Sequence, residues 1–260
     1  PFGIWPFWRI SNFIVDKTIN GVIGQVFKEK KLPLSKDFLI RPCDLVLTVV
    51  SKALMSNRGR MDDIFKFTGF LRWQAPESQE QETRITTFSE GERVPVLSFG
   101  SVAFDDTHSI ISRFEKNWPR GKKIVVQTGW SGLSVEVERP EILVVGKMSH
   151  DQLFRHASCV VHHGGAGTTA SVLTAGKPHI IIPHIADQHF FGAEMKRLEV
   201  GVVIIQKHWP EQLPSRVQLI EEQQSYSQKA VEIQKVLQEE DGPVNAVKAL
   251  ETFVTDFRSH

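Results

Sequence analysis

The sequence predicts an α/β protein built on a doubly wound parallel sheet. From residue 91 onward, short β-rich runs alternate with helical segments, which is typical of parallel strands joined by crossover helices. Runs such as VPVLSF and HIIIP have little polar alternation, as expected of strands covered on both faces. The predicted strands are Val94–Phe99, Ile124–Gln127, Ile142–Val145, Ser158–His162, His179–Ile182 and Val202–Ile205. The predicted helices lie near 106–117, 150–156, 168–175, 187–198, 214–238 and 244–256.

The first 92 residues do not repeat this pattern. A helix near 8–31 and a strand near Leu45–Val50 are too little for an independent α/β domain. Residues 1–73 are therefore interpreted as the end of a preceding domain, and a start at Pro1 instead of Met suggests that a natural N-terminus has been removed. Residues 74–92 are polar and are interpreted as a linker, which leaves 93–260 as the main domain.

Charge and cysteine content exclude several classes of protein. The 260 residues carry a formal net charge of +1, so no global field favours nucleic acid or an anionic membrane. Cys43 and Cys159 lie far apart beside apolar neighbours, which indicates a reducing compartment and two buried thiols. No apolar run approaches the roughly 20 residues of a membrane helix, and no signal peptide is recognisable. We expect a cytoplasmic protein with at most peripheral membrane contact.

The strongest functional signal is VVHHGGAGTT, residues 160–169. A predicted strand runs into glycines and then into a helix, with Thr168 or Thr169 as the expected N-cap and Gly176 as the terminator. N–H groups at a helix N-terminus bind anions, and glycines let a phosphate approach the backbone closely. A histidine at the end of the strand adds a donor, at the edge where open α/β sheets bind ligands. We therefore expect a phosphate-binding loop.

Other interpretations of this loop stay open. Seven of the ten histidines fall between His150 and His189, which raises a metal site. Adjacent strand side chains point to opposite faces, however, and no Cys or acidic partner has zinc-like spacing. Another interpretation is a glycine turn that binds no ligand. It would place two histidines at the end of a buried strand, where burying their polar atoms is costly. The run GAGTTA also fits the dinucleotide pattern of a dehydrogenase, with Asp187 on the ribose, although three strands precede it.

Residues 154–204, which contain HASCVVHHGGAGTT and PHIADQ, resemble the donor-binding signature of family 1 nucleotide-sugar glycosyltransferases with the GT-B fold. HHGGAGTT is closest to the sterol 3-β-glucosyltransferases and the antibiotic glycosyltransferases, and SFGSV and QTGWSGL fit the sterol branch. The resemblance covers about 95–205 strongly and 40–75 loosely. It implies that 93–260 is the C-terminal, Rossmann-like nucleotide-sugar domain and that 1–73 is a remnant of the N-terminal acceptor domain.

The resemblance also implies roles for individual residues. The donor diphosphate would be held by His162, Gly164, Gly165, Ala166, Gly167 and Thr168, with Ser98, Gly100 and Ser101. The nucleoside would lie near Gly129, Trp130, Met148 and Ser149, and the sugar hydroxyls near Asp187 and Gln188. Each of these roles has a structural alternative. Asp187 would then be only a helix N-cap, Trp130 a core residue, and Ser98 and Ser101 turn residues. His163 is expected to pack or to bond water.

The implied reaction is an inverting transfer of a hexose, glucose in particular, from a UDP-sugar to a hydroxyl of a lipophilic acceptor such as a sterol. The UDP-sugar is a co-substrate, and neither a metal nor a nucleic-acid partner is expected. In this family the general base is a histidine of the N-terminal domain, and residues 1–73 contain no histidine. The chain is accordingly expected to be a fragment, a subunit completed by a partner chain, or a non-catalytic UDP-sugar-binding scaffold. The aromatic residues Trp5, Phe7, Trp8 and Phe13 would line a lipid-like pocket, lie on a membrane or pack in a core.

Overall fold

The computed structural model describes residues 5–31, 33–34, 44–55, 64–72, 75–99, 107–128 and 139–258. The chain divides into two compact units. The first contains Pro1–Thr48, Gly59–Phe67 and Ala246–His260, and the second contains Val49–Arg58 and Thr68–Asn245. Every described residue of the predicted donor site belongs to the second unit. The assignment of the two parts to an acceptor remnant and a donor domain stays a prediction.

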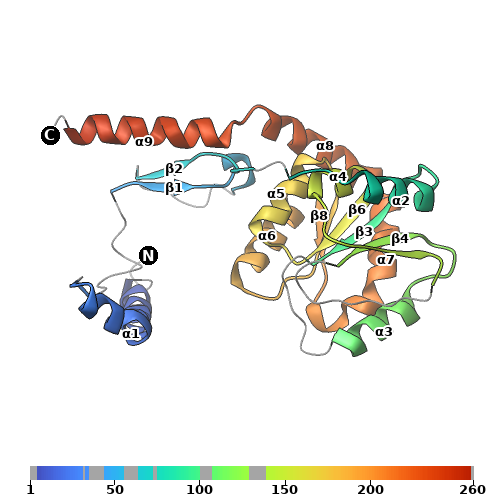
Figure 1. Ribbon diagram of the computed structural model, residues 1–260, viewed down its shortest axis with the longest axis horizontal. Helices are drawn as coiled ribbons and strands as arrows, with labels where there is room; N and C mark the ends of the chain where they lie inside the picture. The colour runs from blue at the N-terminus through green and yellow to red at the C-terminus, as the bar shows by residue number, and fades with distance from the viewer. Residues whose placement is uncertain are drawn as a thin grey trace. The chain divides into compact units, whose positions relative to one another are not determined.

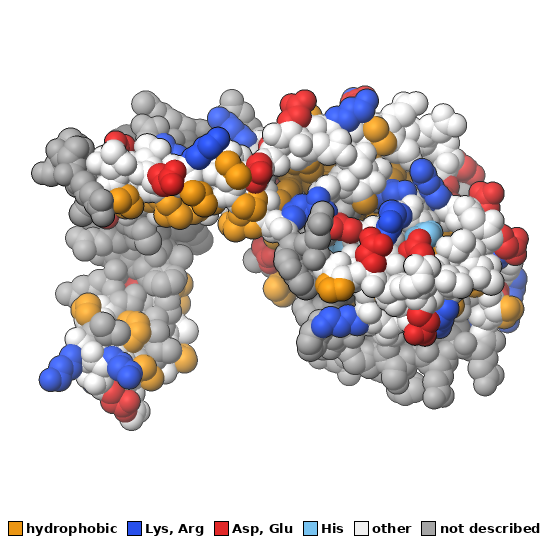
Figure 2. All heavy atoms as spheres, turned by 45° about the horizontal axis from the view of Figure 1, so that its top comes forward, with side chains coloured by type: hydrophobic (Ala, Val, Ile, Leu, Met, Phe, Trp, Pro, Cys, Tyr) orange, Lys and Arg blue, Asp and Glu red, His pale blue; other side chains and the backbone are white. Residues whose placement is uncertain are grey.

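The first unit holds helix α1, Trp5–Glu29, and a parallel pair of short strands, β1 (Val46–Thr48) and β2 (Phe65–Phe67). The sequence predicts α1 and β1 but not β2. Helix α9, Gly242–Arg258, begins in the second unit and continues into the first. Figure 2 shows hydrophobic side chains in a row along α9, where Val247 is 52% exposed. In the described part of the chain, no helix has the length and apolar character needed to cross a bilayer.

The second unit is built on a six-stranded parallel sheet. Its strands are β3 (Val94–Ser98), β4 (Ile124–Gln127), β5 (Ile142–Val145), β6 (Ala157–His162), β7 (His179–Ile181) and β8 (Gly201–Val203). They lie in the order β5-β4-β3-β6-β7-β8. The chain thus winds outward from β3 in one direction and, starting again at β6, outward in the other. This order confirms the predicted doubly wound sheet, and each predicted strand is present within two residues of its expected bounds.

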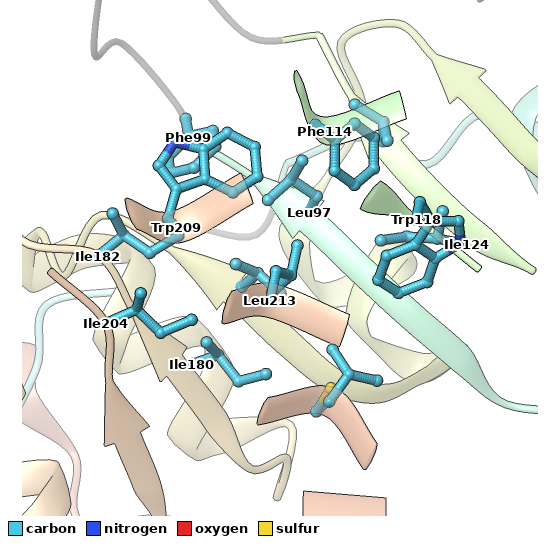
Figure 3. Close-up of a cluster of buried hydrophobic side chains, with 14 of the residues drawn as sticks. Leu97, Phe99, Phe114, Trp118, Ile124, Ile180, Ile182, Ile204, Trp209 and Leu213 are labelled. Atoms are coloured by element: carbon cyan, nitrogen blue, oxygen red, sulfur yellow. The ribbon is translucent and has the colours of Figure 1, made fainter. Parts of the chain in front are cut away.

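Helices cover both faces of the sheet (Figure 1). One face packs against α3 (Thr107–Asn117) and α7 (Trp209–Glu222). Figure 3 shows Phe114 of α3, Trp118 directly after α3 and Trp209 of α7 in the resulting core. The other face packs against α2 (Gln79–Ser89), α4 (His150–Arg155), α5 (Ala166–Thr174), α6 (Ala186–Arg197) and α8 (Gln224–Gln238). The second unit also contains two short 3₁₀ helices among its described residues, η1 (Lys52–Leu54) and η2 (Gln206–His208). Burial raises the pKa of Cys159 to about 12, as expected of an inert thiol, whereas Cys43 lies outside the described residues.

Two predictions are corrected here. The segment interpreted as a linker, 74–92, contains α2, whose Ile85 is completely buried against the sheet. The single helix predicted at 214–238 is two helices, α7 and α8. Gln223 separates them because its backbone is extended, with φ −97° and ψ 92°, so the helical hydrogen bonds stop there.

The burial of Ile85 makes α2 part of the core, and this can be tested by substitution. Ile85→Ala is expected to lower the free energy of unfolding by about 3 kcal/mol, because it removes buried methyl groups and leaves a cavity. Thr87→Ala, on the exposed side of the same helix, is the matched control and is expected to change it by less than about 0.5 kcal/mol. Urea denaturation measures both values, and equal values for the two variants would mean that α2 is a detachable surface segment.

Candidate nucleotide-sugar site

The carboxyl ends of β3 and β6 meet where the winding direction of the sheet reverses. Ser98, the last residue of β3, pairs in register with His162, the last residue of β6. The glycine loop follows His162 directly and leads into α5 at Ala166. Open α/β sheets bind their ligands at such a switch point. The topology therefore places the loop where an anion site is expected.

Helix α5 begins without a side-chain cap. Its N-cap is Gly165, and in the described part of the chain no side chain accepts a hydrogen bond at this cap, which corrects the predicted cap at Thr168 or Thr169. The predicted terminator is confirmed, since Gly176 follows the C-cap Ala175 with a left-handed φ of 64°. The first N–H groups of a helix have no partner within the helix and lie at the positive end of its dipole. The start of α5 can therefore donate hydrogen bonds to an anion.

The three glycines of the loop differ in what a side chain at each position would meet. Gly164 has a φ of 91°, and a Cβ there would lie 2.9 Å from Cγ2 of Ile181. A Cβ on Gly165 would collide with the imidazole ring of His163. A Cβ on Gly167, in contrast, would meet no atom of the described residues within 4 Å. Gly164 and Gly165 thus allow the loop to pack closely, and Gly167 leaves space open beside the helix end.

This open space is part of a pocket of about 690 Å³. Among the predicted site residues, the pocket is lined by Met148, Ser149, Ala166, Gly167 and Thr168. It is also lined by polar residues that the sequence reasoning missed: Arg72, Gln127, Lys147, His150 and Asp151. The structure therefore brings three of the predicted diphosphate residues and two of the predicted nucleoside residues to one cavity. Gln127 and Lys147 could have been found from the sequence, because each stands at or just after the end of a predicted strand.

Ser98 lies under the pocket and does not open into it. Its side chain is 1% exposed, and its hydroxyl donates to Oε1 of Gln127 at 2.8 Å. The side-chain amide of Gln127 in turn donates to the carbonyl of Met148 at 3.1 Å. The predicted contact of the Ser98 hydroxyl with the diphosphate is therefore corrected: this hydroxyl orients Gln127, which reaches the pocket.

His162 is also not a surface donor. Its side chain is 0% exposed, with Nε2 2.9 Å from Nδ1 of His179, while Nδ1 accepts from the backbone N–H of Gly164 at 3.1 Å. Burial lowers the pKa of His162 well below its ordinary value, and His179 lowers it further. A neutral ring with both nitrogens engaged inside the fold cannot donate to a phosphate in the pocket. The predicted direct contact of His162 with the diphosphate is therefore wrong.

His163 is the histidine that borders the loop. Its ring packs against Gly165, its side chain is 9% exposed, and its Nδ1 has no hydrogen-bond partner among the described residues. Burial lowers the pKa of His163, and the carboxylate of Asp187 acts in the opposite direction. The role predicted for His162 fits this neighbour better. Among the described residues, no three His, Cys, Asp or Glu side chains come together as a metal site would require.

The residues predicted to bind the sugar lie in the first turn of α6. The N-cap of α6 is Ile185, so Asp187 is not the cap, and its side chain is exposed. Gln188 is 5% exposed, and its side-chain oxygen accepts from the N–H groups of His184 at 2.7 Å and of Ile185 at 3.2 Å. Gln188 therefore holds the turn into α6, and Asp187 presents a carboxylate near His163.

One wall of the pocket carries an ion pair. Nη2 of Arg72 lies 2.6 Å from Oδ1 of Asp151, which is in the first turn of α4. Ser149 caps this helix by accepting from the N–H of Gln152 at 3.3 Å. Both charged side chains are 36% exposed, so solvent screens the pair, and it contributes orientation more than stability. The remaining predicted site residues, Gly100, Ser101, Gly129 and Trp130, lie outside the described residues.

A doubly wound parallel sheet, with a glycine loop and an uncapped helix at its switch point, defines an α/β protein of the Rossmann-like class. Residues 124–253, half of the chain, match the family model described as erythromycin biosynthesis protein CIII-like, C-terminal domain. The chain belongs to this family.

Curated proteins and solved structures agree with this family. The chain is 36% identical over 179 residues to the sterol 3-beta-glucosyltransferase UGT80B1 of Arabidopsis thaliana, a match that covers 66% of this chain and 28% of that protein. It is 29% identical over 131 residues to the vancomycin aglycone glucosyltransferase of Amycolatopsis orientalis, covering 50% of this chain and 32% of that protein. The crystal structure of the kitacinnamycin glycotransferase matches 95% of this chain and 67% of its own, with a TM-score of 0.70 and 17% identity. The predicted GT-B donor-domain fold is thereby confirmed, and the chain spans about a third or less of these curated relatives.

Proposed function

We propose that this chain is the donor-binding part of a glycosyltransferase and that its pocket holds the UDP moiety of a UDP-sugar. The observation that carries the proposal is the uncapped N-terminus of α5, which opens at Gly167 into a pocket of about 690 Å³. Backbone N–H groups at such a helix end suit a diphosphate, because each can donate to a charged oxygen at no side-chain cost.

In this proposal the diphosphate lies against Gly167 and Thr168, which line the pocket at the start of α5. The imidazole ring of His163 borders the same loop, with Nε2 as the ring atom nearest Gly165. The nucleoside lies toward Met148 and Ser149, which line the same pocket. The exposed carboxylate of Asp187 receives hydroxyls of the sugar. When the glycosidic bond to UDP breaks, negative charge develops on the diphosphate, and fixed N–H dipoles stabilise that charge without reorganising.

The donor sugar and the acceptor are proposals taken from the relatives. Glucose as the sugar, and a lipophilic hydroxyl such as that of a sterol as the acceptor, rest on the name of the Arabidopsis relative. An inverting transfer also needs a general base for the acceptor hydroxyl, and we propose that this group comes from an acceptor domain or partner chain. The alternative is a UDP-sugar-binding scaffold without catalysis of its own. No metal ion is part of the proposal.

Isothermal titration calorimetry with UDP, uridine and NADH tests the donor proposal. UDP is expected to bind, uridine to bind more weakly by about tenfold or more because it lacks the charge-assisted phosphate contacts, and NADH not to bind. Binding of NADH in place of UDP would point to a dehydrogenase. Equal affinity for UDP and uridine would exclude the loop as the diphosphate site.

Substitution of Asp187 tests the contact with the sugar separately from the contacts with UDP. Asp187→Ala is expected to weaken UDP-glucose binding by about tenfold, the worth of a charge-assisted hydrogen bond, and to leave UDP binding unchanged. Glu211→Ala, which removes an acidic side chain distant in sequence that pairs with Arg113, controls for the loss of negative charge. An equal loss of affinity for UDP and UDP-glucose would show that Asp187 acts on the loop and not on the sugar.

A further inference from the structure

A hydrogen-bonded pair of imidazole rings lies directly under the glycine loop. His162, at the end of β6, and His179, at the start of β7, are both 0% exposed, and their rings are 5.2 Å apart between centroids. The two nitrogens that face one another, Nε2 of His162 and Nδ1 of His179, are 2.9 Å apart. Neither ring lines the pocket, so the proposed donor contacts do not explain the pair.

The hydrogen bonds determine which nitrogen of His162 carries the proton. The N–H of Gly164 points at Nδ1 of His162 at 3.1 Å, so this nitrogen must be an acceptor. In a neutral imidazole the other nitrogen is then the donor, and Nε2–H of His162 donates to Nδ1 of His179. The chain of hydrogen bonds therefore runs from Gly164 through His162 to His179.

Gly164 is the residue at which the chain leaves the sheet and turns toward the pocket. Its left-handed φ of 91° is strained for any other residue, and a Cβ there would be crowded by Cγ2 of Ile181 and by the backbone of Gln188. The ring of His162 accepts its N–H and so fixes the orientation of the peptide between His163 and Gly164. The direction in which the following N–H groups point depends on this peptide.

We propose that His162 is a positioning residue that acts through the N–H of Gly164, and that His179 supports it by holding the tautomer in which Nδ1 accepts. The role of the loop in holding a diphosphate rests on the function proposed above, whereas the link between His162 and Gly164 does not. An aliphatic side chain could fill the same buried space without hydrogen bonds. Burying two imidazoles is costly unless their polar atoms are paired. Three of the four ring nitrogens take part in this chain of hydrogen bonds, which reaches the loop backbone, whereas Nε2 of His179 has no partner among the described residues.

Two substitutions at the same position separate positioning from packing. His162→Asn places an amide oxygen near the position of Nδ1 and can still accept from Gly164, whereas His162→Gln reaches toward Nε2 and loses that acceptor. His163–Gly164 is the only His–Gly dipeptide in the sequence, so ¹³C-carbonyl histidine with ¹⁵N-glycine labelling isolates a single NMR signal for the Gly164 amide. Hydrogen exchange of this amide and the Kd for UDP are then measured for the wild type and both variants.

His162→Asn is expected to keep slow exchange at Gly164 and a Kd for UDP within about threefold of wild type, and His162→Gln to speed the exchange and raise the Kd by about tenfold, the worth of one hydrogen bond. Equal exchange in the two variants overturns the proposal. If the wild type shows slow exchange at Gly164 and the variants differ as expected but UDP does not bind, the proposed function fails and the positioning role stands. If neither variant folds, ¹⁵N shifts of the wild-type histidine rings decide, because a proton on Nδ1 of His162 would exclude acceptance from Gly164.

Discussion

Gly167→Phe is expected to abolish UDP binding while the protein stays folded. Among the residues that the structure describes, no atom lies within 4 Å of a Cβ built at this position, and Gly167 lines the pocket at the N-terminus of α5. A phenyl ring would therefore occupy the space proposed for the diphosphate without displacing any part of the fold. Two lost charge-assisted hydrogen bonds would weaken UDP binding by at least about 100-fold, which calorimetry would detect as the absence of a binding isotherm.

Gly167→Ala is the matched control for this prediction. Alanine favours a helix over glycine by up to about 1 kcal/mol, so the free energy of unfolding is expected to rise slightly or stay constant. Its methyl group reaches less far into the pocket, so UDP affinity is expected to fall less than in Gly167→Phe. Wild-type affinity in a folded Gly167→Phe protein would place the nucleotide elsewhere.

Acidification is expected to destabilise the protein strongly, because the folded state keeps two buried histidines neutral. The pKa of His179 is lowered to about 3 by burial, and that of His162 is also well below its ordinary value. In the unfolded chain both rings take up protons below about pH 6.5, so stability is complete above that pH and is lost as the pH falls toward 3. Between pH 7 and pH 5, His179 alone is expected to lower the free energy of unfolding by about 2 kcal/mol, and His162 acts in the same direction.

Urea denaturation at pH 7, 6 and 5 measures this loss. His162→Asn removes one of the two titrating rings, so its loss of stability between pH 7 and pH 5 is expected to be smaller than that of the wild type. The difference between the two proteins matters most, since other histidines and carboxylates that titrate in this range are common to both. An identical pH dependence in wild type and variant would mean that His162 is protonated in the fold at pH 5.

The sheet can be predicted from the sequence because buried parallel strands appear in it as short, continuous apolar runs between turn residues. Helix α2 escapes prediction because its 11 residues are almost all polar and only Ile85 and Ser89 are buried. The break between α7 and α8 escapes because Gln223 is neither glycine nor proline and nothing in the sequence stops the helix there. Tertiary packing determines both the position of α2 and the break between α7 and α8, and the local amino-acid composition does not indicate either of them.

The site is predictable to the level of the loop but not of the side chain. The glycines and Thr168 can be predicted because they follow a strand whose carboxyl end lies at the ligand-binding edge of the sheet, whereas Met148 and Ser149 come from the family resemblance. The choice between His162 and His163 cannot be made in the same way. Adjacent side chains point to opposite sides, and which one is buried depends on how β6 pairs with β3 and β7 and on how α5 covers it. Arg72 comes from a segment before the sheet, and no spacing rule connects it to the loop.

The missing cap of α5 also limits how stable the free protein can become. A serine or aspartate N-cap typically adds about 1 kcal/mol to a helix by accepting from its first N–H groups. At Gly165 such a side chain would compete with the phosphate for those same donors and would press on the ring of His163. Under the donor role proposed above, a better cap at this residue would therefore stabilise the empty protein and at the same time weaken donor binding.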